Sequence, residues 1–151
     1  PKMRHPGTFN ANPLSAAAGI ATLELVATGE PCRKANEAAR LLRQRLNRLF
    51  AERGWDWVAY GEFSGVRLLP RYDGPRPDSD DFIPHGGAFE KLDPPPEPKL
   101  VHAFRRGMLL HGVDLPGLGG MTTAAHTEDD VERTVAAVAA TVEALREEAV
   151  V

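Results

Sequence analysis

The sequence predicts an α+β fold in which helices cover a small, mostly antiparallel sheet. Two short runs of aromatic and branched residues, 57–60 and 66–69, are bounded by glycines and predict strands. Apolar residues recur at helical spacing near the end of the chain, from Val131 to Leu145. The whole chain reads as helix, strands, helix, strands, helix. This order favours one layer of helices packed on one face of a sheet.

The first two helices are predicted from the residues at their ends. Asn12 is a good N-cap and Pro13 suits the first helical position, so we expect a helix over 13–28 that stops at Gly29. It is rich in alanine and apolar nearly all round, which is typical of a helix buried at a domain or subunit junction. A second helix is expected to end at Gly54, and its arginines are interpreted as a solvated face. Its apolar face is expected to contain Ala35, Ala38, Leu42, Leu46 and Leu49.

The middle of the chain is predicted to contain a hairpin and a long loop. The segment 61–65 would join the two strands. The stretch 70–98 holds most of the chain's 13 prolines and is expected to be an irregular surface loop. We favour a flexible excursion here over a ligand site at His85 and the two glycines that follow it.

The last third is predicted to contain two helices and two more strands. A helix is expected over 97–111, followed by short strands at 113–115 and 121–125. The final helix should begin at Thr127, whose hydroxyl is a good N-cap. Its first turn is acidic, which suits the positive end of the helix dipole.

Composition excludes several classes of function. The chain has 151 residues, a net charge of -3 and a pI near 6, so no basic surface is expected to bind nucleic acid. No apolar run approaches the roughly 20 residues that cross a bilayer, and no membrane partner is expected. Cys32 is the single cysteine and cannot form an internal disulfide, so the expected location is cytoplasmic.

Two segments carry polar residues that could do chemistry. Gly7 and Thr8 offer an unobstructed main-chain N–H and a hydroxyl, which together can donate hydrogen bonds to a phosphate. By spacing alone, such a segment is also typical of a simple turn. His126 precedes the predicted cap, and a structural role is favoured over catalysis. The histidines have no spacing that indicates a metal site.

Both segments resemble one known family. His5-Pro-Gly-Thr-Phe-Asn-Ala-Asn-Pro13, with the alanine-rich helix after it, is similar to the Gly-Thr-(x)3-Asn-Pro segment of class III pyridoxal-phosphate-dependent aminotransferases. Thr122-Thr-Ala-Ala-His-Thr-Glu-Asp-Asp130 resembles the sequence that opens the last helix of the same family. The similarity is strongest to the glutamate-1-semialdehyde 2,1-aminomutase branch, and it leaves the proline-rich loop unmatched.

The resemblance implies a cofactor, a partner and a domain division. It implies that Gly7 and Thr8 hold the phosphate of pyridoxal phosphate (PLP) bound to the neighbouring subunit of a homodimer. Residues 1–29 would be the end of the large cofactor-binding domain with its connecting helix, and 30–151 the C-terminal small domain of a fold-type I enzyme. The substrate would be a small amino acid or amino aldehyde. The lysine that bonds PLP lies upstream in the family, so none of Lys2, Lys34, Lys91 and Lys99 is expected to take that role.

One position departs from the aminomutase pattern. A glutamate stands eight residues before the histidine of the closing segment in aminomutases, and Leu118 stands there in this sequence. This favours transamination over aminomutase activity. A freestanding α+β binding or dimerisation module without catalysis is the alternative, and a split enzyme is a third possibility.

Overall fold

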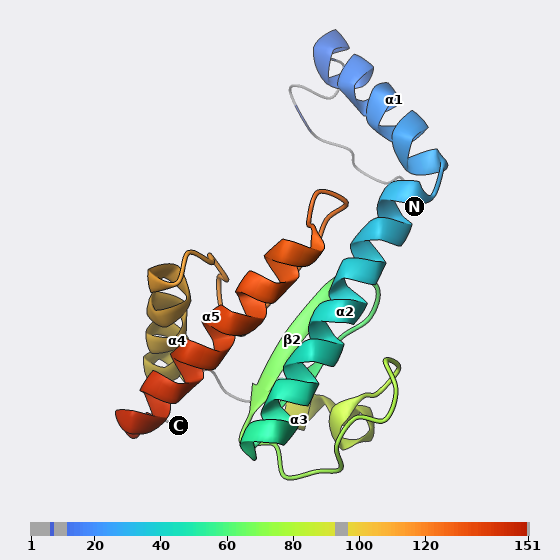
Figure 1. The fold of residues 1–151 in the computed structure, drawn as a ribbon. Helices are drawn as coiled ribbons and strands as arrows, with labels where there is room; N and C mark the ends of the chain where they lie inside the picture. Colours follow the sequence, from blue (N-terminus) through green and yellow to red (C-terminus); the bar gives the residue numbers. More distant parts are fainter. Residues whose placement is uncertain (1–6, 8–11, 93–96, 151) are drawn as a thin grey trace.

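The computed structural model describes residues 7, 12–92 and 97–150. The elements follow the order α1 (Pro13–Ala27), α2 (Glu30–Arg53), β1 (Trp57–Tyr60), β2 (Gly65–Pro70), η1 (Pro84–Gly87), α3 (Phe89–Leu92), α4 (Pro98–Leu110), β3 (Gly119–Met121) and α5 (Glu128–Glu147). The predicted α+β class is confirmed, since the long helices α2, α4 and α5 pack around one antiparallel sheet (Figure 1).

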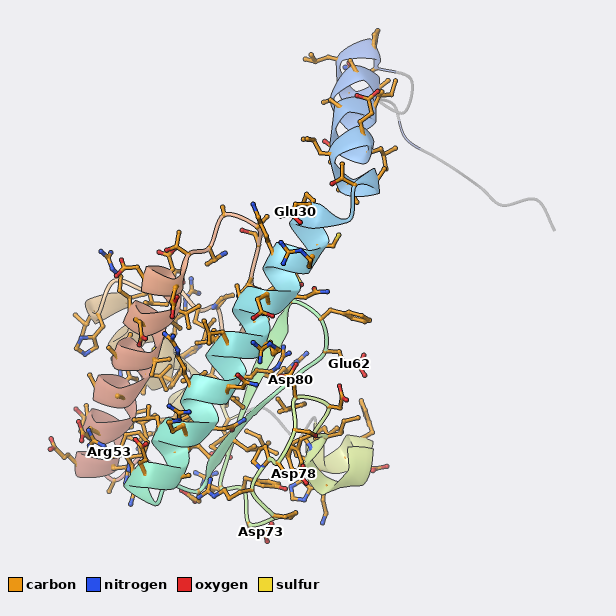
Figure 2. All side chains as sticks on the ribbon, turned by 45° about the vertical axis from the view of Figure 1, so that its right-hand side comes forward. Glu30, Arg53, Glu62, Asp73, Asp78 and Asp80 are labelled. Carbon is orange, nitrogen blue, oxygen red and sulfur yellow. The ribbon has the colours of Figure 1, made fainter. Side chains whose placement is uncertain are left out.

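Helix α1 begins where its cap predicts. The Asn12 side chain accepts hydrogen bonds from the N–H groups of Leu14 and Ser15, and Pro13 occupies the first helical position. No residue of α1 is buried, and the helix projects from the rest of the chain (Figures 1 and 2). Its large apolar side chains are exposed, namely Leu14, Ile20, Leu23, Leu25 and Val26. The burial predicted at a domain or subunit junction is not tested within the described chain and stays a prediction.

Helix α2 is the main support of the sheet. It starts after Gly29 and ends at Gly54, both of which adopt the left-handed conformation that glycine tolerates best. It packs against β1 and β2, and the Asn47 side chain hydrogen-bonds both the N–H and the C=O of Ala59, each at 2.8 Å. The buried face is shifted from the predicted one and consists of Ala35, Ala39, Leu42, Arg43, Leu46 and Phe50.

The described chain forms a three-stranded antiparallel sheet in the order β1-β2-β3. Tyr60 pairs with Arg67, and Arg67 pairs with Gly119 on its other side. The predicted hairpin is confirmed. The predicted strand at 113–115 is wrong, and the strand predicted at 121–125 is found at Gly119–Met121 instead. The cause is pairing with β2: the Leu118 C=O accepts from the Leu68 N–H at 2.7 Å, so the chain joins the sheet at the glycines.

Helices α4 and α5 complete the helical layer. Helix α5 packs against α2 and α4, and a Cβ at Gly107 of α4 would lie 2.5 Å from the Thr141 Cγ2 of α5. Only glycine permits so close an approach. The N-terminus of α5 is fixed by a capping box, in which Thr127 and Asp130 hydrogen-bond each other's backbone N–H groups. The predicted start of this helix is confirmed.

The core lies between the helices and one face of the sheet. Trp57 is fully buried, with its ring stacked on Phe104 at a centroid distance of 5.7 Å and tilted against Phe50 at 6.1 Å. The Trp57 Nε1 is a buried donor without a partner among the described residues. Leaving a buried N–H without an acceptor costs about 1–3 kcal/mol of folding free energy. The packing of the indole ring against Phe50 and Phe104 offsets this penalty.

Candidate functional site

A wide, open hollow lies over the face of the sheet that bears Arg67 and Leu69, and the start of α4 also lines it. Strands β2 and β3, the first half of α2, the hairpin turn, the segment 116–118 and the proline-rich loop line the rest of it. Side chains alternate along β2, so Val66 and Leu68 enter the main core while Arg67 and Leu69 face this hollow. The loop covers only part of that face, where Leu69 packs with Val58 and Tyr72 in a small second cluster.

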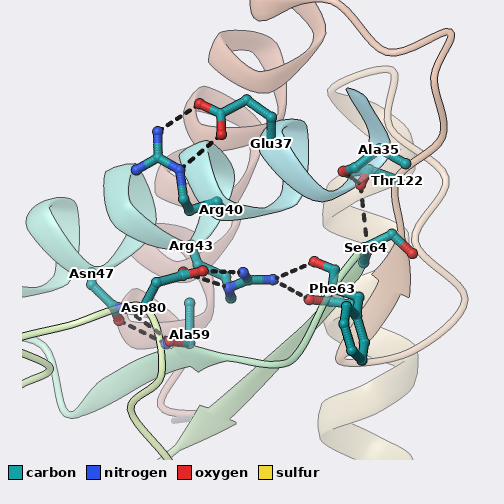
Figure 3. Close-up of polar contacts among 11 residues, drawn as sticks. Ala35, Glu37, Arg40, Arg43, Asn47, Ala59, Phe63, Ser64, Asp80 and Thr122 are labelled. Carbon is teal, nitrogen blue, oxygen red and sulfur yellow. Dashed lines mark hydrogen bonds and ion pairs between the residues drawn. The ribbon is translucent and has the colours of Figure 1, made fainter. Parts of the chain in front are cut away.

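The loop between β2 and α4 is fixed to the sheet by Arg43 (Figure 3). The guanidinium of Arg43 donates to the Asp80 carboxylate at 2.6 and 3.0 Å, and to the C=O groups of Phe63 and Gly65 at 3.1 and 2.6 Å. Its side chain is 4% exposed. The interpretation of all the α2 arginines as a solvated face is thus wrong for Arg43, which joins α2, the hairpin turn and the loop.

Two further contacts hold the loop in place. Arg76 donates to the C=O groups of Trp55 and Trp57 at 2.6 and 2.9 Å. Tyr72 is buried, its hydroxyl donates to the Pro75 C=O at 3.1 Å, and its ring lies edge-on to His85 at 5.0 Å. Burial raises the pKa of the Tyr72 phenol. In place of a wholly irregular excursion, the described part contains η1 and α3 and forms one wall of the hollow.

The closing segment is held by its own hydrogen bonds. The Thr122 hydroxyl donates to the Ala35 C=O at 2.6 Å, which ties the end of β3 to α2. The Nδ1 of His126 accepts from the Thr123 N–H at 3.0 Å and lies 3.0 Å from the Thr123 hydroxyl. His126 therefore closes the turn before α5, in agreement with the structural role that we favour.

The predicted phosphate segment is described only in part. Gly7 is exposed, and Thr8 lies outside the described residues. Gly7, the described member of the pair, does not line the hollow. Among residues 12–92 and 97–150, no group of three or more metal-binding side chains is close enough to hold an ion. None of the described helices combines the length and the apolar character needed to cross a bilayer.

Comparison with known proteins relates this architecture to one group of enzymes. No family model matches the chain. It is 33% identical over 135 residues to the glutamate-1-semialdehyde 2,1-aminomutase of Pyrobaculum islandicum, covering 87% of this chain and 29% of that protein. It is 28% identical over 140 residues to the aminomutase of Hyperthermus butylicus, again covering 29% of the relative. The chain thus spans less than a third of the length of these curated relatives.

Solved structures give the same relationship. A β-phenylalanine aminotransferase from Variovorax paradoxus matches with a TM-score of 0.73 and 25% identity, over 97% of this chain and 31% of that one. An omega-transaminase from Sphaerobacter thermophilus matches with a TM-score of 0.70 and 22% identity, over 95% of this chain and 31% of that one. This chain corresponds to the C-terminal part of a PLP-dependent aminotransferase-like protein. Its fold is that of the C-terminal domain of fold-type I enzymes.

In this aminotransferase-like chain, no described lysine has the surroundings of a covalent cofactor site. Lys34, Lys91 and Lys99 are all exposed, and Lys34 pairs with Glu30 at 3.6 Å. An amine that reacts with a carbonyl is normally activated by desolvation or by a neighbouring cation. None of the three described lysines is therefore a candidate for the covalent bond to PLP.

Two arginines show what sequence reasoning missed, whereas Leu118 was singled out by the sequence. Leu118 lines the hollow and also packs against the main core. Arg43 follows Ala39 and precedes Leu46 and Phe50 at helical spacing, so periodicity could have placed it on the buried face. Arg67 stands between Val66 and Leu68 in a strand, and simple alternation could have assigned it to the opposite face of the sheet.

Proposed function

We propose that this chain is the C-terminal portion of a class III PLP-dependent enzyme that transfers amino groups. The observation that carries the proposal is the agreement of two comparisons, since the aminomutase match covers 87% of the chain and the aminotransferase fold covers 97%. When bound, PLP would supply an electron sink for the bonds that break at the amino carbon. A neighbouring structure is a transaminase with PLP bound.

The residues of this chain would bind and enclose, and would not form the covalent bond to the cofactor. We propose that Gly7 and Thr8 donate hydrogen bonds to the cofactor phosphate across the interface of a homodimer. Residues 1–29 would belong to the large domain and its connecting helix, and 30–151 would form the small domain beside the substrate. The exposed apolar side chains of α1, from 42% exposed at Val26 to 80% at Leu14, support a position between domains or subunits.

The substrate would be a small amino acid or amino aldehyde, and the complete enzyme would work in the cytoplasm. Leu118 cannot offer a carboxylate to the hollow that it lines, so we propose transamination to an external acceptor rather than an intramolecular exchange. A carboxylate near the reacting amino groups would help to position them, and a leucine would not.

The experiment uses the complete gene product, with any upstream large domain. It should show the absorption of bound PLP and transfer amino groups from a panel of amino donors to pyruvate or 2-oxoglutarate. Formation of 5-aminolevulinate from glutamate 1-semialdehyde should be slower than its best transamination. A complete protein that neither binds PLP nor transfers amino groups would refute the proposed function, whereas dominant aminolevulinate formation would refute only the choice of transamination.

A further inference from the structure

Phe63 has a strained backbone conformation in the turn between β1 and β2. Its φ is 49°, in the left-handed region that glycine and asparagine enter far more readily than phenylalanine. Its side chain is 73% exposed and lines the hollow. A glycine would form the same turn without strain, and the aromatic ring gains little burial within the described chain. Backbone strain of this kind is typical of positions that serve a function.

The strained turn is held by Arg43, which also holds the proline-rich loop (Figure 3). Nη1 of Arg43 donates to the C=O groups of Phe63 and Gly65 at 3.1 and 2.6 Å, while Nε and Nη2 donate to the Asp80 carboxylate. Asp80 stands three residues before Ile83, which is 47% exposed and also lines the hollow. One guanidinium therefore connects the two segments that carry Phe63 and Ile83.

A buried guanidinium is not the group that stability alone favours at this position. Arg43 lies on the buried face of α2 with Ala39 and Leu46, and its side chain is only 4% exposed. Removing a guanidinium from water is costly, and a well-packed apolar side chain often stabilises such a position equally well or better. Apolar packing is not directional, whereas hydrogen bonds from a planar fork fix the relative positions of their acceptors. The network thus sets the spacing of the turn and the loop.

We propose that Arg43 is a positioning residue for the substrate, and that Phe63 and Ile83, which it places, contact the side chain of an apolar amino acid. The inference rests on the proposed function, because it takes the hollow as the place where the substrate of amino transfer lies. Exposed apolar side chains on the wall of a hollow gain burial when an apolar group enters. An amino donor with a large apolar side chain, such as phenylalanine, would therefore be preferred over alanine.

The first test measures how the complete enzyme discriminates between phenylalanine and alanine as amino donors. Phe63→Gly should lower the ratio of kcat/KM for phenylalanine to kcat/KM for alanine by about ten-fold, as expected for losing the burial of a large apolar group. It should not lower the midpoint of urea denaturation, because glycine adopts the turn conformation without strain. Phe89→Ala is the matched control and should leave the ratio unchanged, because Phe89 is 70% exposed but does not line the hollow.

The second test separates positioning by Arg43 from a purely structural role. Arg43→Lys keeps the positive charge but loses the fork that reaches the turn and Asp80 together. It should lower the same ratio, mainly through a higher KM for phenylalanine. Because Arg43 acts through Phe63, the double variant with Phe63→Gly should lower the ratio by less than the product of the two separate effects. A purely structural role would lower kcat/KM for both donors equally.

A binding measurement makes the test independent of turnover. Phenylpropionate carries a phenyl group and a carboxylate but no amine, and propionate lacks the phenyl group. Titrated calorimetrically into the complete protein, phenylpropionate should bind about ten-fold more weakly to Phe63→Gly, and propionate should be affected less. Phenylpropionate binding that is absent or indifferent to Phe63 would overturn the proposal.

Three further outcomes would also overturn it. They are equal losses for phenylalanine and alanine in the Phe63 and Arg43 variants, a ratio that falls in the Phe89 control, and destabilisation of the complete protein by Phe63→Gly. The last would mean that Phe63 packs against another part of the protein or a second copy of it. A protein that binds phenylpropionate through Phe63 but transfers no amino group would instead refute the proposed function alone.

Discussion

Arg43 on α2 and Asp80 in the proline-rich loop form a two-point ion pair, with N–O distances of 2.6 and 3.0 Å. The same guanidinium donates to two C=O groups of the hairpin turn. A single buried side chain therefore fixes two segments that are far apart in the sequence (Figure 3).

Removing the Asp80 carboxylate, which pairs with Arg43, should lower the free energy of unfolding more than removing an exposed carboxylate does. Asp80→Asn leaves a buried guanidinium without its counter-charge, and we expect the free energy of unfolding to fall by about 1–3 kcal/mol. Urea titration measures the change. The matched control is Asp78→Asn, an exposed residue of the same loop. Equal, small effects at both positions would mean that the pair contributes nothing to the fold.

The hydroxyl of Thr127 should stabilise the start of α5. Thr127→Ala removes the acceptor for the Asp130 N–H and should destabilise the protein by about 1 kcal/mol. Thr127→Ser keeps the hydroxyl and serves as the control. A denaturation midpoint for the alanine variant that matches the wild type would exclude Thr127 as the effective cap.

The Asp130 carboxylate, the second member of the capping box, predicts that the free energy of unfolding depends on pH. Hydrogen bonds from the Thr127 N–H and hydroxyl lower the pKa of Asp130 below its ordinary value. Because the folded-state pKa is the lower one, this stabilisation is fully present above the unfolded pKa of about 3.9 and is lost as pH falls through the folded value. The difference in unfolding free energy between wild type and Asp130→Asn should therefore be constant near neutrality and shrink below about pH 4. A difference that does not vary with pH would contradict the assignment.

The isolated chain should form no specific covalent adduct with PLP. Since Lys34, Lys91 and Lys99 are exposed, none has the desolvated surroundings that activate an amine. Incubation with PLP, reduction with borohydride and peptide mapping should give scattered, incomplete labelling. One stoichiometric adduct on a single lysine would show that this chain carries its own covalent site.

The proposed action of Thr8 across the interface can be tested by mixing subunits of the complete enzyme. Thr8→Val should weaken PLP binding by about ten- to hundred-fold through loss of a hydrogen bond to a charged group. A mixed dimer pairs a Thr8→Val subunit that keeps the covalent lysine with a Thr8 subunit that lacks it. Its one competent site should regain nearly normal affinity for PLP. If affinity instead follows the Thr8 of the lysine-bearing subunit, the contact lies within one chain.

Elements whose ends carry strong local signals could be predicted from the sequence. Asn12 caps α1, Gly54 ends α2 and Thr127 caps α5, as their residue types predict. These features depend on backbone preferences within a few residues. The short strand at Gly119–Met121 could not be placed in this way, because its residues favour no strand and its pairing with β2 decides its position.

The candidate site was harder to predict because it depends on residues distant in sequence. The contact of Arg43 with Asp80 joins positions 37 residues apart, and no local pattern indicates which loop carboxylate will meet a helix arginine. The resemblance of the chain ends led to Gly7 and Thr8, but it gave no information on the proline-rich loop. That loop covers part of a sheet face, and Arg67 stands on the part that the loop leaves uncovered.

The burial of Trp57 also has a spectroscopic consequence. The chain contains two tryptophans, and both Trp55 and Trp57 belong to the main core, at 5% and 0% exposure. With no hydrogen bond to the Trp57 Nε1 among the described residues, its emission should be blue-shifted and should move to the red when the core opens. Intrinsic fluorescence would therefore report on the layer formed by α2, β1 and α4. It would stay insensitive to ligands that touch only the outer rim of the hollow, where an added reporter dye would be needed.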